Sequence, residues 1–388
     1  MFKLGVRAAL CSLSGYAEVS RSIVTGLDKL GVDIYLEMID DKIYESSKPS
    51  LSASLVETID RLQRPVPKGV PIISLCTPPQ YYTEPGRFLV GYGLFEAHSV
   101  PQPWLIEMNK MNLIITMSTF NQEVFVKQGI SRKKIEIVSP AVDSTRFHPS
   151  VEPFYSHVVR EFPILFLGQL ILRKGWDKLL IAALRAFNTH ENVCVILKLP
   201  PVRHEAQTTE MINKIKAIKL EAGSSKVPIY FNNMAIPTES VPRVYQIVRK
   251  RLPGYIYEHL NDGPPRGIFA LPSLGEGAAL PYLEAMSSGL LVLGTNVTGS
   301  EYLNPRNAVI VNTGSPVKSL EVELEHSLYR GAVWPRVDVA AVEDALLRAY
   351  NMDATTRNNI ETTARKQAEE MTYLKTCQAI INAIQSHM

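Results

Sequence analysis

The first part of the chain alternates between short hydrophobic runs and longer segments in which apolar positions recur with helical spacing. The hydrophobic runs are rich in β-branched residues and include 32–38, 72–76, 113–117 and 135–138. The segments with helical spacing include 17–30 and 120–129. Strands and helices that alternate in this way are typical of βαβ units, which build a mainly parallel sheet.

The second part of the chain repeats the same alternation. Its hydrophobic runs cover 164–167, 193–198, 268–270, 290–294 and 308–311, and 176–188 has helical spacing. From residue 339 onward the pattern is helical only, with a last helix expected over 372–385. The chain therefore predicts two α/β domains, each Rossmann-like, followed by helices that either cap the second domain or return to the first.

The best candidate for a linker between the two domains lies at 147–163. This stretch contains Pro149, Pro153 and Pro163 and has no clean periodicity. A length of 388 residues also favours two domains over one, because single cores stop growing well below that size. We expect an N-terminal domain at 1–152, a C-terminal domain at 153–370, and a final helix at 371–388 that packs on one of them.

Charge and cysteine usage narrow the class of protein. The 41 basic and 38 acidic residues leave a net charge of +3, which gives no general attraction to nucleic acid or membrane. The four cysteines are scattered singly, so their spacing indicates neither a zinc site nor a disulfide framework. We expect a cytoplasmic protein without a signal peptide or transmembrane segment, and no metal site.

The most informative segment is 270–303, which has the pattern strand, glycine-rich loop, helix, glycine, strand. Gly275, Glu276 and Gly277 form the loop, which we expect to be mobile, and Pro281 fits the first turn of the helix that follows. Backbone amides at the start of a helix attract anions. The sequence therefore predicts an anion-binding helix start here.

Glu276 and Glu284 are separated by seven residues and flank this helix start. Two carboxylates that only accept hydrogen bonds suit a ligand rich in hydroxyl donors, such as a sugar or a ribose. Taken alone, Glu276 fits a helix cap and Glu284 fits a solvated helix surface equally well. The surrounding pattern favours ligand binding.

This segment resembles the retaining GT-B glycosyltransferases whose signature is Glu, seven residues and Glu, known as glycosyltransferase family 4-like or glycosyl transferases group 1. The resemblance implies that Glu284 binds the ribose of a nucleotide-sugar donor and that Glu276 acts near the transferred sugar. It also implies that the donor is bound by the loop amides of Gly277, Ala278, Ala279 and Leu280. The sequence departs from the family at Ala279, where a glycine is usual.

Residues 166–175 resemble the family's element of a strand, Gly-Arg, a short loop and Lys-Gly. The resemblance implies that Lys174, together with Arg173, holds the donor diphosphate. Fixed cations at this place stabilise the charge that develops on the departing diphosphate. The family's arginine is replaced by Gln169, so one cation is either missing or moved to Arg173.

The first domain carries weaker signals of the same resemblance. Gly15 and Tyr16 precede a helix and resemble the family's N-terminal glycine loop, which approaches the donor diphosphate or the acceptor. His98 is the candidate for the histidine that many members place against the donor sugar, and Glu96 is an alternative polar contact. The stretch 251–266 is longer than usual and is either an acceptor loop or a surface insertion.

The resemblance implies hexosyl transfer with retention, without a metal or other cofactor, from a nucleoside diphosphate sugar to a glycan, lipid, protein or small molecule. The predicted catalytic residues are Glu276, Lys174 and His98. Two alternatives stay open: a catalytically degenerate nucleotide-sugar-binding protein of the same fold, and a GT-B nucleotide-sugar epimerase. The interpretation as a catalytically degenerate protein stays open because Gln169 and Ala279 depart from the family's pattern.

Overall fold

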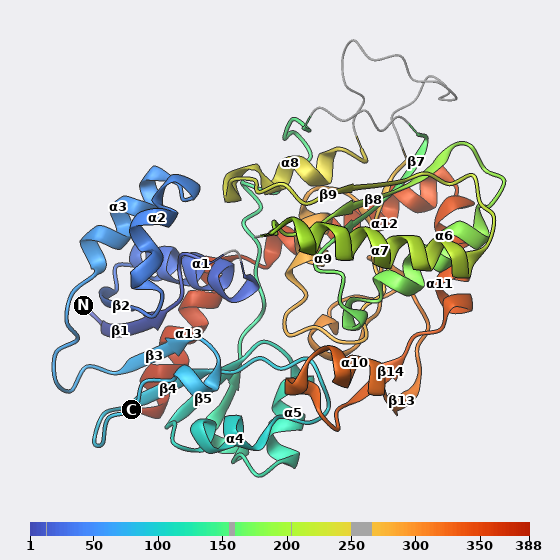
Figure 1. The fold of residues 1–388 in the computed structure, drawn as a ribbon. Coiled ribbons are helices and arrows are strands. Elements are labelled where there is room, and N and C mark those ends of the chain that lie inside the picture. The colour runs from blue at the N-terminus through green and yellow to red at the C-terminus, as the bar shows by residue number, and fades with distance from the viewer. Residues whose placement is uncertain (13, 155–159, 203, 250–265) are drawn as a thin grey trace. The chain divides into compact units, whose positions relative to one another are not determined.

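A computed structural model of the chain describes residues 1–12, 14–154, 160–202, 204–249 and 266–388 (Figure 1). The chain forms two compact units. The first contains Met1–Val142, Pro237–Glu239 and Met371–Met388, and the second contains Asp143–Ile236 and Ser240–Glu370. The break after Val142 lies ten residues before the position expected from the sequence.

The first unit contains a six-stranded parallel sheet with the strand order β2-β1-β3-β4-β5-β6. Its strands are β1 (Lys3–Ala8), β2 (Asp33–Met38), β3 (Ile72–Leu75), β4 (Leu89–Tyr92), β5 (Leu113–Thr116) and β6 (Ile135–Ile137). Its helices are α1 (Gly15–Lys29), α2 (Tyr44–Ser47), α3 (Ala53–Leu62), α4 (Gln102–Asn109), α5 (Thr119–Lys127) and α13 (Tyr373–His387). Strands β3, β4 and β5 are buried along their whole length, as expected for a sheet covered on both faces.

The last helix of the chain, α13, packs against α1 in this unit (Figure 1). The two helices approach closely at Gly26, where an added Cβ would lie 2.6 Å from Cys377 Sγ. The entry to α13 is fixed by the Val142 amide, which donates to the Met371 carbonyl at 2.9 Å. Residues from the two ends of the chain therefore share one core.

The second unit contains a parallel sheet with the strand order β12-β11-β10-β7-β8-β9 and a separate two-stranded antiparallel sheet, β13-β14. Its strands are β7 (Phe162–Leu167), β8 (Val193–Lys198), β9 (Ile229–Asn232), β10 (Ile268–Leu271), β11 (Leu291–Gly294), β12 (Val309–Ile310), β13 (Gly314–Lys318) and β14 (Val333–Arg336). Its helices are α6 (Trp176–Ala186), α7 (Glu205–Ala222), α8 (Val241–Gln246), α9 (Leu280–Ser287), α10 (Leu320–Glu325), α11 (Val339–Tyr350) and α12 (Ala354–Glu370). The predicted α/β class and parallel sheets are thus confirmed.

The strand order places the reversal of each sheet beside its first strand. In the second unit the chain proceeds from β7 to β8 and β9 on one side, and then returns to place β10 on the other side of β7. In the first unit the corresponding reversal lies between β1 and β3. Open parallel sheets bind ligands at the carboxyl ends of the strands at such a reversal, so the fold itself indicates the loops after β7, β10, β1 and β3.

Candidate functional site

The second unit brings two loops together where its sheet reverses direction. One loop follows β7 and contains a 3-10 turn, Leu172–Lys174, and the other follows β10 and runs to α9. Strands β7 and β10 are paired neighbours, with Ile164 opposite Ile268. Residues separated by about a hundred positions in the sequence therefore meet at one edge of the sheet.

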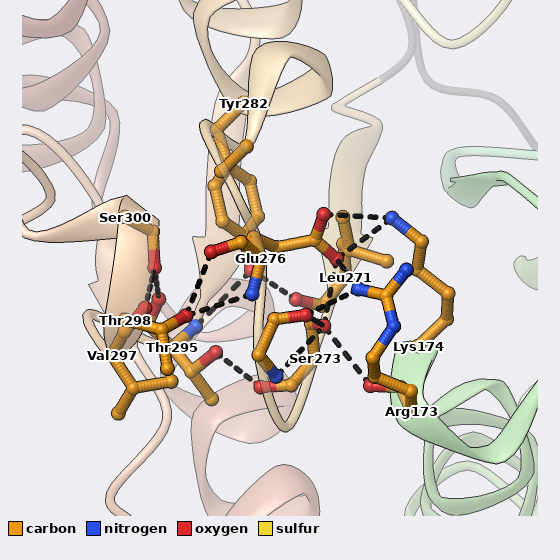
Figure 2. A network of polar contacts seen from close by, with 12 residues as sticks. Arg173, Lys174, Leu271, Ser273, Glu276, Tyr282, Thr295, Val297, Thr298 and Ser300 are labelled. Atoms are coloured by element: carbon orange, nitrogen blue, oxygen red, sulfur yellow. Dashed lines mark hydrogen bonds and ion pairs between the residues drawn. The ribbon is translucent and has the colours of Figure 1, made fainter. Parts of the chain in front are cut away.

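One contact between these loops is an ion pair of Lys174 with Glu276 (Figure 2). Lys174 Nζ lies 2.7 Å from both Glu276 Oε1 and Glu276 Oε2. Arg173 adds a second cation, with its guanidinium 3.5 Å from Oε1. Glu276 is 6% exposed, so these cations compensate a carboxylate that is almost completely removed from water.

Ser273 and Arg173 hold the loop that carries Glu276 (Figure 2). The Ser273 hydroxyl lies 2.7 Å from Glu276 Oε1, and the Gly275 amide donates to Ser273 Oγ at 3.3 Å. The Arg173 guanidinium donates to the Gly275 carbonyl, and the Leu274 amide donates to the Arg173 carbonyl at 2.8 Å. The loop expected to be mobile is thus held by many polar contacts, and Arg173 contacts the loop itself.

Thr298 fixes Glu276 from the opposite side. The Glu276 amide donates to Thr298 Oγ1 at 2.7 Å, and the Thr298 hydroxyl lies 3.0 Å from the Glu276 carbonyl. Thr298 has a φ of 55°, a left-handed conformation that costs a β-branched residue energy. The backbone and the carboxylate of Glu276 are both held in a single orientation as a result.

Two glycines allow the close approach of backbone in this site. Gly175 has a φ of 66°, and an added Cβ would lie 2.0 Å from the Pro272 carbonyl oxygen. An added Cβ at Gly299 would lie 2.0 Å from the Gly277 carbonyl oxygen. No residue other than glycine fits at either position without a shift of the backbone.

The electrostatics of the site keep Glu276 ionised. Burial by itself raises the pKa of the Glu276 carboxyl, but Lys174 and Arg173 outweigh it and leave the pKa below its ordinary value. The site therefore holds one buried anion against two cations at neutral pH.

Helix α9 begins directly after this loop. Its N-cap is Ala279, with a φ of 50° and ψ of 41°, and Pro281 occupies the first turn. Ala278, Ala279 and Leu280 are buried and Gly277 is partly exposed. The departure from the family pattern thus falls on a residue with the left-handed conformation that favours glycine.

Glu284 lies on α9 and is half-buried. Tyr245 on α8 donates its phenolic proton to Glu284 Oε2 at 2.6 Å. The structure therefore places Glu276, Glu284, Lys174 and Arg173 in one unit around the start of α9. Gln169, at the family's arginine position, is exposed and follows β7.

The first unit carries the remaining predicted residues and is described by itself. Gly15 begins α1 directly after the loop that follows β1, and the carboxylate of Asp40 holds that loop by accepting from the Cys11 amide at 2.7 Å. Tyr16 donates to the Leu94 carbonyl at 3.3 Å and so connects α1 to the segment after β4. An added Cβ at Gly15 would meet nothing within 4 Å, so packing does not require this glycine.

His98 lies in the same segment after β4 and is exposed, with Glu96 half-buried nearby in the sequence. The His98 ring packs edge-on against Phe120, with ring centroids 5.0 Å apart. Most of the predicted stretch 251–266 lies outside the residues that the structure describes.

Sequence reasoning missed Ser273, Thr298 and Tyr245. Ser273 was visible in the loop motif itself, since a serine three residues before a glutamate commonly hydrogen-bonds locally. Nothing in the sequence marked Thr298 or Tyr245, because their contacts with the two glutamates depend on how separate elements pack.

Comparison with known proteins gives a family match over part of the chain and a fold shared over its whole length. Residues 266–328 match the family model described as glycosyl transferases group 1. A comparison with curated proteins finds no match.

Solved structures similar to the whole chain include HepE from Anabaena in complex with UDP-glucose, at 13% identity and TM-score 0.63, covering 100% of both chains. A glycosyltransferase from Rickettsia africae has 13% identity and TM-score 0.64, covering 100% of this chain and 98% of the other. A trehalose 6-phosphate synthase from Burkholderia multivorans has 10% identity and TM-score 0.63, covering 100% of this chain and 99% of the other.

The matched segment contains Glu276, Glu284 and the whole of α9. The fold around it, two α/β units that each contain a parallel sheet, is the GT-B fold. The resemblance predicted from the sequence therefore agrees with the family match over residues 266–328 and with the fold of these solved structures.

Two further observations concern the described part of the chain. None of its helices combines the length and the apolar character that a membrane span requires. No group of three or more His, Cys, Asp and Glu side chains within it is arranged to hold a metal ion.

Proposed function

We propose that the protein transfers a hexosyl group from a nucleoside diphosphate sugar to an acceptor hydroxyl with retention of the anomeric configuration. The observation that carries the proposal is the position of Lys174 and Glu276 at the reversal of the second sheet, directly before α9. Cations and a helix start suit a diphosphate, and the carboxylate suits a sugar hydroxyl. UDP-glucose is the first donor to test, since UDP-glucose is bound in the similar HepE structure.

In the proposed reaction, the bond between the anomeric carbon and the diphosphate oxygen breaks while the acceptor oxygen attacks from the same face. The acceptor proton goes to the departing diphosphate oxygen. Lys174, together with the amides from Gly277 to Leu280, stabilises the charge on that diphosphate. We assign no covalent nucleophile.

Donor binding requires a change at the Lys174 contact. In the structure, both oxygens of Glu276 lie 2.7 Å from Lys174 Nζ. A lysine ammonium has three protons to donate. The proposed arrangement has Lys174 bridging Glu276 and a diphosphate oxygen, which keeps the buried carboxylate compensated throughout.

We also propose that no divalent ion is needed, because protein cations stand beside the proposed diphosphate position. In the first unit, Gly15, Tyr16 and His98 are the proposed contacts of the donor or the acceptor. A cytoplasmic location is supported by the four cysteines, which are all buried as free thiols.

Thermal-shift measurements with UDP, GDP, ADP and their common sugars test donor binding without an acceptor, because a ligand of the native state raises the Tm. We expect one base to stabilise the protein, and Glu284→Ala to abolish that shift. Labelled donor with EDTA present then tests turnover, and NMR of the product tests retention. Binding without hydrolysis or transfer would identify a degenerate sugar-nucleotide-binding protein, and a changed sugar on an intact nucleotide would identify an epimerase.

A further inference from the structure

The phenolic hydroxyl of Tyr245 hydrogen-bonds to Glu284, the carboxylate proposed to bind ribose. Tyr245 on α8 is 0% exposed, and its Oη lies 2.6 Å from Glu284 Oε2 on α9. Glu284 is half-buried. The hydroxyl therefore supports the carboxylate from the interior of the unit.

In the hydrogen bond between Tyr245 and Glu284, the tyrosine is the donor. Burial raises the pKa of Tyr245 well above its usual range, and the neighbouring Glu284 carboxylate raises it further. Tyr245 therefore stays protonated at any physiological pH and acts as the donor. A hydrogen bond to an ionised acceptor is stronger than one between neutral groups.

The position of the phenol is fixed by its surroundings. The Tyr245 ring packs edge-on against Phe147, with centroids 5.8 Å apart, and lies 5.6 Å from the ring of Phe269 on β10. The next residue, Gln246, donates to the carbonyls of His148 and Ser288, each at 3.1 Å, and so binds α8 to the end of α9. Neither the ring nor its helix can move far from α9.

We propose that Tyr245 is a positioning residue for donor recognition, which holds one oxygen of Glu284 so that the carboxylate is oriented toward a ribose hydroxyl. The inference rests on the proposed function, because it requires Glu284 to bind the ribose. Fixing one carboxylate oxygen before the ligand arrives lowers the cost of ordering the side chain on binding. The effect should appear as discrimination between ribose and deoxyribose.

The test compares UDP with 2′-deoxy-UDP and 3′-deoxy-UDP, and the guanine and adenine sets in parallel, by calorimetric titration of the full chain. We expect the wild type to bind one ribonucleotide about tenfold more tightly than at least one of its deoxy analogues. Tyr245→Phe should weaken binding of that ribonucleotide about five- to tenfold, leave the deoxy analogue nearly unchanged, and so bring the ratio close to one.

Tyr350→Phe is the matched control. Its hydroxyl accepts from Asn192 Nδ2 at 3.0 Å and makes no contact with Glu284, so the loss of one tyrosine hydrogen bond is reproduced elsewhere in the unit. This variant should keep the wild-type ratio. Melting temperature and near-UV circular dichroism show whether each variant is folded.

The variant Glu284→Ala separates this inference from the proposed function. If Glu284→Ala removes the discrimination and Tyr245→Phe in a folded protein does not, the positioning role is wrong and the donor site stands. If Glu284→Ala leaves the ratio unchanged for all three bases, or no nucleotide binds, the ribose assignment fails and the role of Tyr245 falls with it. In the double variant, Tyr245→Phe should add no further loss, and an additive loss would contradict the proposal.

Discussion

Lys174 and Glu276 form an ion pair in which both carboxylate oxygens lie 2.7 Å from the ammonium. They follow β7 and β10, the neighbouring strands at which the second sheet reverses. The pair therefore lies at the edge where parallel sheets bind their ligands. The same lysine therefore has two tasks: it compensates a buried carboxylate, and it is the proposed contact of the diphosphate. The two tasks can be separated experimentally.

Replacement of Lys174 by methionine should lower the free energy of unfolding by about 3 kcal/mol, because it leaves the buried carboxylate with Arg173 as its remaining cation. The double variant Lys174→Met/Glu276→Gln should recover most of that loss, since no charge is then left uncompensated. Urea unfolding measures both. Neither variant should transfer sugar, and wild-type turnover by the double variant would contradict the catalytic assignment.

Stability should fall in acid through Glu276. The pKa of its carboxyl is depressed in the folded protein, so its contribution is present above the ordinary value of 4.5 and is lost as the pH falls through the lower folded value. The variant Glu276→Gln should be less stable than the wild type at neutral pH, but its Tm should depend less on pH below 4.5. Melting curves across this range test the sign, and parallel curves would show that Glu276 does not contribute.

At position 279, glycine should stabilise the protein more than the native alanine does. Its φ of 50° costs an L-residue about 1 kcal/mol or more, and glycine removes that cost at the expense of a more flexible unfolded chain. We expect Ala279→Gly to raise stability by about 0.5 kcal/mol and to leave donor affinity intact. The adjacent Ala278→Gly, at a residue without positive φ, serves as the control and should not stabilise. Equal effects of the two changes would disprove the strain argument.

Gly15→Ala separates function from packing in the first unit. Nothing lies within 4 Å of the added Cβ, so stability should change by less than about 0.5 kcal/mol. If the backbone approaches a substrate there, transfer should fall clearly. In the same helix, Gly26→Ala places a Cβ 2.6 Å from Cys377 Sγ and should cost about 1–3 kcal/mol through overpacking. Unchanged transfer by Gly15→Ala would remove Gly15 from the site.

Local sequence was sufficient for much of the site. The run over 268–294 predicted a strand, loop, helix and strand. The bounds of both strands and the start of the helix agree with β10, β11 and α9 to within about one residue. Proline and glycine at fixed places, together with a buried hydrophobic run, determine those elements through interactions between near neighbours in the sequence. The spacing of Glu276 and Glu284 was likewise readable, because one short loop and one helix carry both.

Among the strands that the sequence did not predict, β9 and the pair β13 and β14 have weak local signals. Strand β9 has a partly or fully exposed side chain at each of its four positions, and β13, the first strand of the antiparallel pair, is mostly exposed. Without buried alternation there is no periodic pattern to detect. Their pairing is decided by neighbouring strands rather than by their own residues.

Local hydrophobic periodicity and turn chemistry are readable from the sequence alone, so it predicted the two α/β units and the loop and helix that carry Glu276 and Glu284. The strand order is set by tertiary packing, and so are the contacts of Lys174 with Glu276 and of Tyr245 with Glu284. Such contacts join residues that are far apart in the chain. They depend on which strands and helices become neighbours, and a one-dimensional pattern does not contain that information.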